Sequence, residues 1–242
     1  MRLLVTRPEP DASTQANALA KRGHEPVLAP LLTIEFVSHV PPLDLKGAQA
    51  LIATSRNALR ALGSHPELAH ALRLPLYAVG EATAKAAADL GFAGVTTGPG
   101  TAEALARLIA DRLTASTGPL VHLSGETVAF DLKSALAARG FSLRQPILYR
   151  AVPAAELPPD ALSLLKAGRL DGAVLMSPRT AATFARFILQ HGMVTEASRL
   201  NCYCLSGAVA QAVEPLKARL VVAARPSEED VLALIDADAA SL

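Results

Sequence analysis

The sequence predicts an α/β protein built from two doubly wound parallel-sheet domains, which arose by an interleaved duplication and are joined by a two-strand linker. Three observations support this. Short apolar runs alternate with Ala- and Leu-rich helical stretches, a pattern typical of parallel strands covered by helices on both faces. Segments of the second half resemble segments of the first. The matching segments occur in circularly offset order, which is explained by one domain being inserted in the other.

The expected strands are short and mostly unbroken in hydrophobicity. Because most of them lack the alternation of a half-exposed strand, we expect both faces of each sheet to be buried. In chain order they are Leu3–Thr6, Glu25–Leu28, Ala50–Thr54, Leu76–Val79, Gly94–Thr97, Leu120–Leu123, Ile147–Arg150, Gly172–Met176, Cys202–Leu205 and Leu220–Ala223.

Helix ends carry their own signals. A glycine follows several helical stretches, as at Gly23, Gly91 and Gly140, and glycine favours the left-handed conformation that ends a helix. Ser227, followed by three acidic residues, predicts a capped helix start.

The internal repeat sets the domain boundaries. Residues 94–105 align with 221–232, and the same offset carries Gly80 to Gly207; residues 52–56 match 174–178, and 134–141 resemble 17–24. We therefore expect an outer domain of residues 1–36 plus 152–242 and an inner domain of residues 37–148. The crossings lie near 33–37 and 148–152, where both segments are β-prone.

Composition limits the function. The 242 residues are 51% hydrophobic and 19% charged, enough for a full core. With 23 Lys and Arg against 22 Asp and Glu, binding of nucleic acid by bulk charge is not expected. No signal peptide or membrane-spanning run is evident, which predicts a cytoplasmic protein. Cys202 and Cys204 are expected to be reduced thiols on opposite faces of one strand, one in the core and one near the surface.

Five strand-to-helix turns are rich in small or hydroxyl residues. Helix N-termini at the carboxyl ends of parallel strands suit carboxylate or phosphate groups, so we expect an anion-lined cleft between the two domains. Helix capping alone explains any one of these turns equally well. The turns are Thr6-Arg7-Pro8, Thr54–Asn57, Val79–Thr83, Leu123–Glu126 and Met176–Arg179.

Motifs for known cofactors are missing. The first strand is not followed by a dinucleotide-binding glycine fingerprint, and there is no phosphate-binding loop. The six histidines are scattered without metal-ligand spacing. We therefore expect neither a cofactor nor a metal.

Several motifs, in order along nearly the whole chain, resemble the uroporphyrinogen-III synthase family. They are Leu4–Pro8, Gly23-His24-Glu25, Ala29–Leu32, Thr54–Ala58, Ala78–Ala84, Ser124-Gly125-Glu126, Leu148-Tyr149-Arg150 and Ser177-Pro178. The resemblance implies a lyase of heme and porphyrin biosynthesis. Such an enzyme cyclises hydroxymethylbilane, a polycarboxylate, with loss of water and inversion of ring D, through a spirocyclic intermediate and without a cofactor.

The resemblance also implies roles for particular residues. Tyr149 matches the tyrosine proposed to assist the departure of water, and it is the expected catalytic residue. The residues expected to bind substrate carboxylates are Thr6, Arg7, Ser55, Arg56, Gly80, Thr83, Ser124, Gly125, Ser177, Ser206 and Gly207. Ala210 stands where the family usually has a threonine, which leaves that contact in doubt.

Partners and alternatives follow from the same reasoning. We expect a monomer that takes hydroxymethylbilane as a free molecule or by transient handover from hydroxymethylbilane synthase. A two-lobed binding or sensor protein for an anionic ligand is the main alternative. An enzyme using a nucleotide cofactor is disfavoured by the missing glycine fingerprint.

Overall fold

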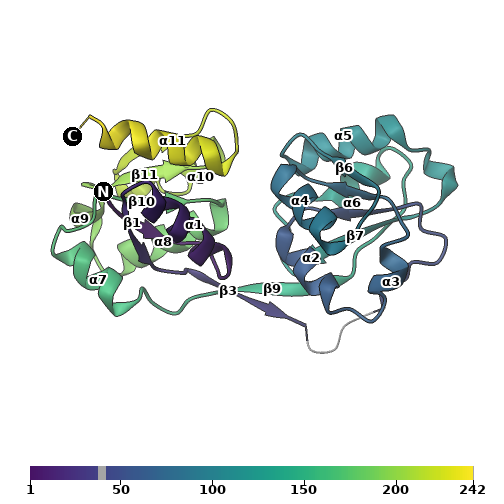
Figure 1. Ribbon diagram of the computed structural model, residues 1–242, viewed down its shortest axis with the longest axis horizontal. Helices are drawn as coiled ribbons and strands as arrows, with labels where there is room; N and C mark the ends of the chain where they lie inside the picture. The colour runs from purple at the N-terminus through teal and green to yellow at the C-terminus, as the bar shows by residue number, and fades with distance from the viewer. Residues whose placement is uncertain (38–41, 242) are drawn as a thin grey trace. The chain divides into compact units, whose positions relative to one another are not determined.

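The computed structural model describes residues 1–37 and 42–241. By their internal contacts these residues form two compact units. Unit 1 contains Met1–Thr33 and Val152–Leu242, and unit 2 contains Ile34–Ala151. Both chain termini belong to unit 1 (Figure 1). Each unit is a mixed α/β body with a parallel sheet.

The sheet of unit 1 has five strands in the order β12-β11-β10-β1-β2. Every neighbouring pair in it is parallel. Because β10 follows an excursion through the whole of unit 2, the central pair of β1 and β10 joins distant parts of the chain. The strands are β1 (Arg2–Val5), β2 (Glu25–Leu28), β10 (Gly172–Leu175), β11 (Asn201–Cys204) and β12 (Arg219–Val222).

Helices cover both faces of this sheet (Figure 1). Leu3 and Val5 pack with α1 (Asp11–Lys21) and α11 (Glu228–Ala239), whereas Leu4 packs on the other side with the remaining helices. This division explains the unbroken apolar strands, since successive side chains enter different cores. The other helices are α7 (Pro159–Lys166), α8 (Pro178–Gln190), α9 (Val194–Ala197) and α10 (Gly207–Gln211), with a 3-10 turn at Glu214–Leu216.

The sheet of unit 2 has seven strands, in the order β3-β9-β7-β4-β5-β6 with β8 also paired to β7. The adjacent strands β7, β4, β5 and β6 are parallel. The strands are β3 (Leu32–Phe36), β4 (Ala50–Ala53), β5 (Leu76–Ala78), β6 (Val95–Thr97), β7 (Leu120–Gly125), β8 (Leu143–Arg144) and β9 (Ile147–Pro153).

This sheet also lies between two helical layers. Leu51 and Val121 pack in the core of α2 (Arg56–Gly63), α3 (Leu68–Ala71) and α4 (Glu81–Leu90). Ile52 and Leu120 pack on the opposite face with α5 (Ala102–Arg112) and α6 (Leu132–Ala137). A 3-10 turn occupies Ala115–Thr117. All ten strands expected from the sequence are present, nine of them within two residues, whereas β9 runs three residues further than expected, to Pro153. Strand β8 was not expected.

The two crossings between the units are made by β3 and β9, which are neighbours in the sheet. The backbone N–H of Val37 donates to the carbonyl of Leu148 at 3.1 Å, and that of Ala154 donates to Leu31 at 2.9 Å. An ion pair of 2.7 Å between Arg150 and Glu35 links the strands further. The two β-prone crossing segments therefore pair with each other.

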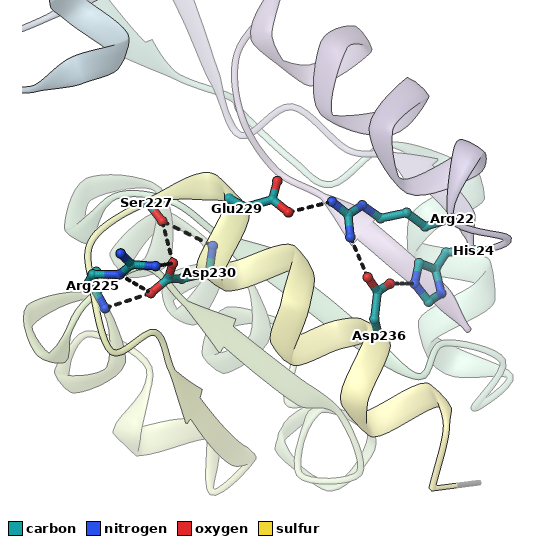
Figure 2. Close-up of polar contacts among 7 residues, drawn as sticks. All are labelled: Arg22, His24, Arg225, Ser227, Glu229, Asp230 and Asp236. Atoms are coloured by element: carbon teal, nitrogen blue, oxygen red, sulfur yellow. Dashed lines mark hydrogen bonds and ion pairs between the residues drawn. The ribbon is translucent and has the colours of Figure 1, made fainter.

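The last helix, α11, is attached to the start of the chain by charged side chains (Figure 2). Arg22 contacts both Glu229, at 2.9 Å, and Asp236. Asp236 also lies 2.9 Å from Nε2 of His24. At the other end, Ser227 caps the helix by accepting the N–H of Asp230 at 3.1 Å, which confirms the helix start read from the sequence. Contacts distant in sequence thus fix α11.

Cys202 and Cys204 are both free thiols, but the expectation that they lie on opposite faces, one of them near the surface, is wrong. Both are fully buried and both pack in the core on the α8 side, whereas Tyr203 between them enters the opposite core. Residues two apart on a strand share a face, which is the physical reason. Burial raises the pKa of Cys202 to about 12 and that of Cys204 to about 11, so both are neutral thiols.

No helix in the described part of the chain has the length and apolar character needed to cross a membrane.

Candidate active site

The expected site residues of unit 2 gather at one edge of its sheet. Strand β4 lies between β5 and β7, and β9 lies beside β7. Because parallel strands end at the same edge, the turns after them are neighbours. The residues brought to this edge are Ser55, Arg56, Gly80, Thr83, Ser124, Gly125 and Tyr149.

Ser55 forms the N-terminal cap of α2. Its hydroxyl accepts the backbone N–H of Asn57 at 3.1 Å, and Arg56 is the first residue of the helix. A serine cap leaves other N–H groups of the first turn without partners in the helix. This turn can therefore receive an anionic group.

Gly80 caps α4 in extended backbone conformation, and Thr83 lies buried in the first turn of that helix. The loop after β6 packs closely here, because Gly100 donates its N–H to the carbonyl of Val79 at 2.7 Å. A Cβ at Gly98 would come within 2.7 Å of the Ala78 carbonyl oxygen, so only glycine fits there.

Tyr149 lies directly over Gly125. The two residues are paired across β9 and β7, and the Glu126 N–H donates to the Tyr149 carbonyl at 2.9 Å. A Cβ at Gly125 would lie 2.7 Å from Cζ of Tyr149 and 3.0 Å from its hydroxyl oxygen. The missing side chain of Gly125 thus leaves the space that the Tyr149 ring occupies. Ser124 beside it is buried and donates to the Pro146 carbonyl at 3.3 Å.

A buried histidine lies beneath the same edge. His122 is 2% exposed, and its Nε2 is 3.0 Å from the hydroxyl oxygen of Thr54, the residue before Ser55. Nδ1 has no hydrogen-bond partner of normal geometry among the described residues, although the Gln145 side chain lies near enough to favour the charged ring. Burial outweighs this and lowers the pKa of His122 to about 4. The ring is therefore neutral near pH 7.

The expected residues of unit 1 also share one sheet edge. Thr6 and Arg7 follow β1, Ser177 follows β10, and Ser206 and Gly207 follow β11, and these strands are consecutive in the sheet. Thr6 is fully buried, and its hydroxyl donates to the Val174 carbonyl at 2.7 Å. Its side chain therefore joins β1 to β10 rather than facing a ligand.

Arg7 is held by carboxylates of the protein itself. Its guanidinium is 2.9 Å from Glu228 and 3.5 Å from Asp11, and Gln15 donates to the same Glu228 at 3.3 Å. The Arg7 side chain is only 13% exposed. A substrate carboxylate would have to compete with Glu228 for this guanidinium.

Ser177 and Ser206 cap the helices that follow them, but differently. The Ser177 hydroxyl accepts the Thr180 N–H at 3.1 Å and lies 2.8 Å from the Thr180 hydroxyl. Ser206 makes no side-chain capping bond. Apart from its chain neighbours and the backbone of its own helix, no atom of the described residues lies within 4 Å of a Cβ built on Gly207. Ala210 is buried in the α8-side core. Ser206 thus keeps its hydroxyl available, while Ala210 offers none.

In the described part of the chain no three His, Cys, Asp or Glu side chains are grouped so that they could hold a metal ion. His39 lies outside the described residues.

The family model of uroporphyrinogen-III synthase HemD matches residues 13–233. The chain belongs to this family. The match takes in turns of both units, including those that carry Ser55, Gly80, Gly125 and Ser177, as well as Tyr149. Membership makes the chain an enzyme of tetrapyrrole biosynthesis, and it confirms the family resemblance seen in the sequence.

Two solved uroporphyrinogen-III synthases show the same fold. One, from Helicobacter pylori, superposes with a TM-score of 0.64 and 20% identity and covers 97% of each chain. The other, a mutant from the extremely thermophilic bacterium Thermus thermophilus, gives a TM-score of 0.61 and 18% identity over 100% of this chain and 98% of that one. No curated protein matches the chain.

Within this synthase fold, sequence reasoning missed two features of the candidate site. These are the contact of the buried His122 with Thr54 and the ion pair between Glu228 and Arg7. The one available signal was a histidine inside the apolar run Leu120–Leu123. That both groups of turns act on one substrate stays a prediction.

Proposed function

We propose that this chain is a cytoplasmic lyase that converts hydroxymethylbilane into uroporphyrinogen III, with loss of water and inversion of ring D and without a cofactor or metal. The observation that carries the proposal is the edge of unit 2. There two helix N-termini, after Ser55 and Gly80, lie at the same sheet edge as Gly125 and the phenol of Tyr149 that packs on it. These groups supply the two functions that the reaction needs: anion binding and a proton donor.

Binding rests on the ends of helices and on hydroxyl groups. The substrate carries carboxylates, and free N–H groups at the N-termini of α2, α4 and α8 complement negative charge. Arg56 supplies a guanidinium at the start of α2. In unit 1, Ser177 and Ser206 supply hydroxyl groups at the starts of α8 and α10. Such contacts hold a flexible chain so that ring D attacks through its substituted carbon, which is a task of orientation.

Tyr149 assists the departure of the hydroxyl group. Its phenol donates a proton or hydrogen bond to the leaving water, which is general-acid assistance. The Gly125 backbone beneath the ring fixes where the phenol lies. The cationic intermediate is then stabilised by the substrate's own pyrrole nitrogens, and the remaining task of the protein is to orient ring D.

We also infer that the two units derive from one ancestral unit by an interleaved duplication. The strand order β12-β11-β10-β1-β2 of unit 1 corresponds to β6-β5-β4-β7-β8 of unit 2. In this correspondence β10, β11 and β12 match β4, β5 and β6, and β1 and β2 match β7 and β8. The repeats read from the sequence fall on the same partners, since residues 17–24 end α1 and residues 134–141 end α6.

The experiment is a coupled assay. Hydroxymethylbilane is generated in place by its synthase, this protein is added, and the products are oxidised to porphyrins and separated as isomers. Uncatalysed closure proceeds without inversion to the type I isomer, so a protein-dependent shift to type III supports the proposal. Type I alone with folded protein contradicts it and favours a binding protein. Sedimentation with and without the preceding synthase tests the expected monomer and any transient handover.

A further inference from the structure

Burial of the polar His122 side chain costs free energy, and packing in the core does not require a polar residue there. It lies in β7 on the face where Ile52 and Leu120 form an apolar core with α5 and α6. A neutral imidazole buried there loses its hydration, and only Nε2 has a regular partner in the described chain. Burying a polar group without full hydrogen bonding destabilises a fold. An apolar residue would satisfy the same position, so the histidine needs another reason.

The partner of His122 points to that reason. Thr54 ends β4 and directly precedes Ser55 and Arg56, which start α2. The bond of 3.0 Å between Nε2 and the Thr54 hydroxyl oxygen holds that side chain from beneath the sheet edge. Because Thr54 is β-branched, fixing its hydroxyl also fixes its χ1 and constrains the adjoining backbone. The turn that offers N–H groups to a carboxylate is thereby held in one conformation.

The neighbouring strand β5 and its following residue hold the end of β4, just before this turn. The Val79 N–H donates to the Ala53 carbonyl at 2.9 Å, and the Gly98–Gly100 loop is fixed against the end of β5. The backbone up to Ala53 is therefore held by sheet hydrogen bonds, and we infer that the orientation of the turn after it depends on the Thr54 side chain. His122 is the residue that contacts this side chain.

We propose that His122 is a positioning residue for substrate binding: through Thr54 it sets the orientation of the Ser55–Arg56 turn that receives a substrate carboxylate. This inference rests on the proposed function. A prearranged turn binds its ligand without a further ordering cost, so His122 acts on affinity rather than on the chemical step.

The test is a set of variants assayed for type III formation. In His122→Phe the ring shape is kept and both nitrogens are lost, while in Thr54→Val the hydroxyl alone is lost. Each variant is expected to raise KM about three- to tenfold, the range of one hydrogen bond, with kcat nearly unchanged. The double variant is expected to be no worse than either single variant, because the two residues act through one bond. His122→Gln, whose amide reaches the position of Nε2, is expected to restore most of the affinity.

Tyr77→Phe is the matched control, because Tyr77 is buried in the same core on β5 and loses only a hydroxyl. Its KM is expected to equal that of the wild type. Additive effects of His122→Phe and Thr54→Val, or a change in thermal stability with KM unaltered, would overturn the proposal and leave a structural histidine. A lowered kcat with normal KM would also overturn it.

A second readout separates this proposal from the proposed function. The backbone amide resonances of Ser55, Arg56 and Asn57 are expected to shift in the same direction in His122→Phe and Thr54→Val, whatever the enzyme acts on. Absence of type III product from the wild type would refute the proposed function, whereas unmoved amide resonances in both variants would refute the positioning by His122.

Discussion

Gly125 and Tyr149 pack against each other at the edge of the unit 2 sheet, because the ring of the tyrosine fills the space that a side chain at Gly125 would need. A Cβ there would lie 2.7 Å from the ring carbon Cζ. The contact joins β7 to β9, which also pair through their backbones. The position of the phenol is therefore determined by a residue that has no side chain. Substitutions at Gly125 and at Tyr149 test this relationship separately.

Gly125→Ala is expected to lower type III formation without unfolding the protein. The added methyl group displaces the Tyr149 ring, and an aromatic side chain on a strand can rotate to make room. We expect the free energy of unfolding to change by less than about 2 kcal/mol, while the rate falls at least tenfold. The coupled assay and urea denaturation measure the two quantities.

Gly94→Ala is the control for that substitution. A Cβ at Gly94 would meet only Pro75, at 3.8 Å, so activity and stability should both be retained. Full activity of Gly125→Ala would show that the placement of the Tyr149 ring does not matter.

Tyr149→Phe tests the proton-donating role directly. The ring and its packing on Gly125 remain, and the hydroxyl is lost. We expect kcat to fall about 100-fold or more with KM little changed, because general-acid assistance contributes on the order of 100-fold or more and binding contacts elsewhere persist. Pre-steady-state formation of type III measures the step, and an unaltered rate would remove Tyr149 from it.

The Asp236 carboxylate is expected to stabilise the attachment of α11 (Figure 2). Burial, the largest single effect, raises its pKa, but hydrogen bonds from His24 and Arg22 more than offset this, so the pKa is lowered. A lowered carboxyl pKa gives stability that is present above the unfolded value near 3.8 and lost as pH falls through the folded value. The substitution Asp236→Asn should therefore lower the free energy of unfolding by up to about 1 kcal/mol at pH 7, after allowance for solvent screening.

Urea denaturation at pH 7 and pH 3 measures this loss. The difference between Asp236→Asn and wild type should shrink at the lower pH, where protonation of the carboxyl group removes part of the ionic contribution. Asp89→Asn, which breaks only the exposed pair with Lys85, is the matched control and should show little change. A difference that is equal at both pH values would contradict the ionic attachment.

His122 predicts a second pH dependence, at higher pH. Its pKa is lowered from 6.5 to about 4 by burial, so the folded state binds fewer protons than the unfolded state between these values. Stability is fully present above pH 6.5 and is lost as pH falls toward 4. Relative to His122→Phe, the free energy of unfolding of the wild type should fall by about 2 kcal/mol between pH 7 and pH 5. Among the described residues, the polar side chains found at the ring are those of Thr54 and Gln145.

Chemical denaturation across this pH range gives the comparison. Because the phenylalanine variant has no titrating group at this position, its curve should be flatter than that of the wild type. Parallel curves would mean that the ring remains charged or hydrated in the folded protein.

The sequence by itself determined the strands, their helical cover and the turns at their ends. Apolar runs such as Leu3–Val5 and Leu51–Ala53 signal burial on both faces, because side-chain direction alternates along every strand. Ser55, Ser177 and Ser227 could be read as helix caps, since capping depends on neighbours two or three residues away. The wrong prediction for Cys202 and Cys204 also concerned a local rule, because residues two apart on a strand lie on the same face and not on opposite faces.

The tertiary structure decided which of these local features meet. His122 with Thr54, Tyr149 with Gly125, and Arg7 with Glu228 are far apart in sequence, and no periodicity encodes their contact. Each pairing depends on strand order and register, which result from packing the whole sheet between its helices. For this reason the sequence could place residues at the edge of a sheet. Only the fold shows that His122 contacts Thr54 before the Ser55–Arg56 turn and that Glu228 forms an ion pair with Arg7.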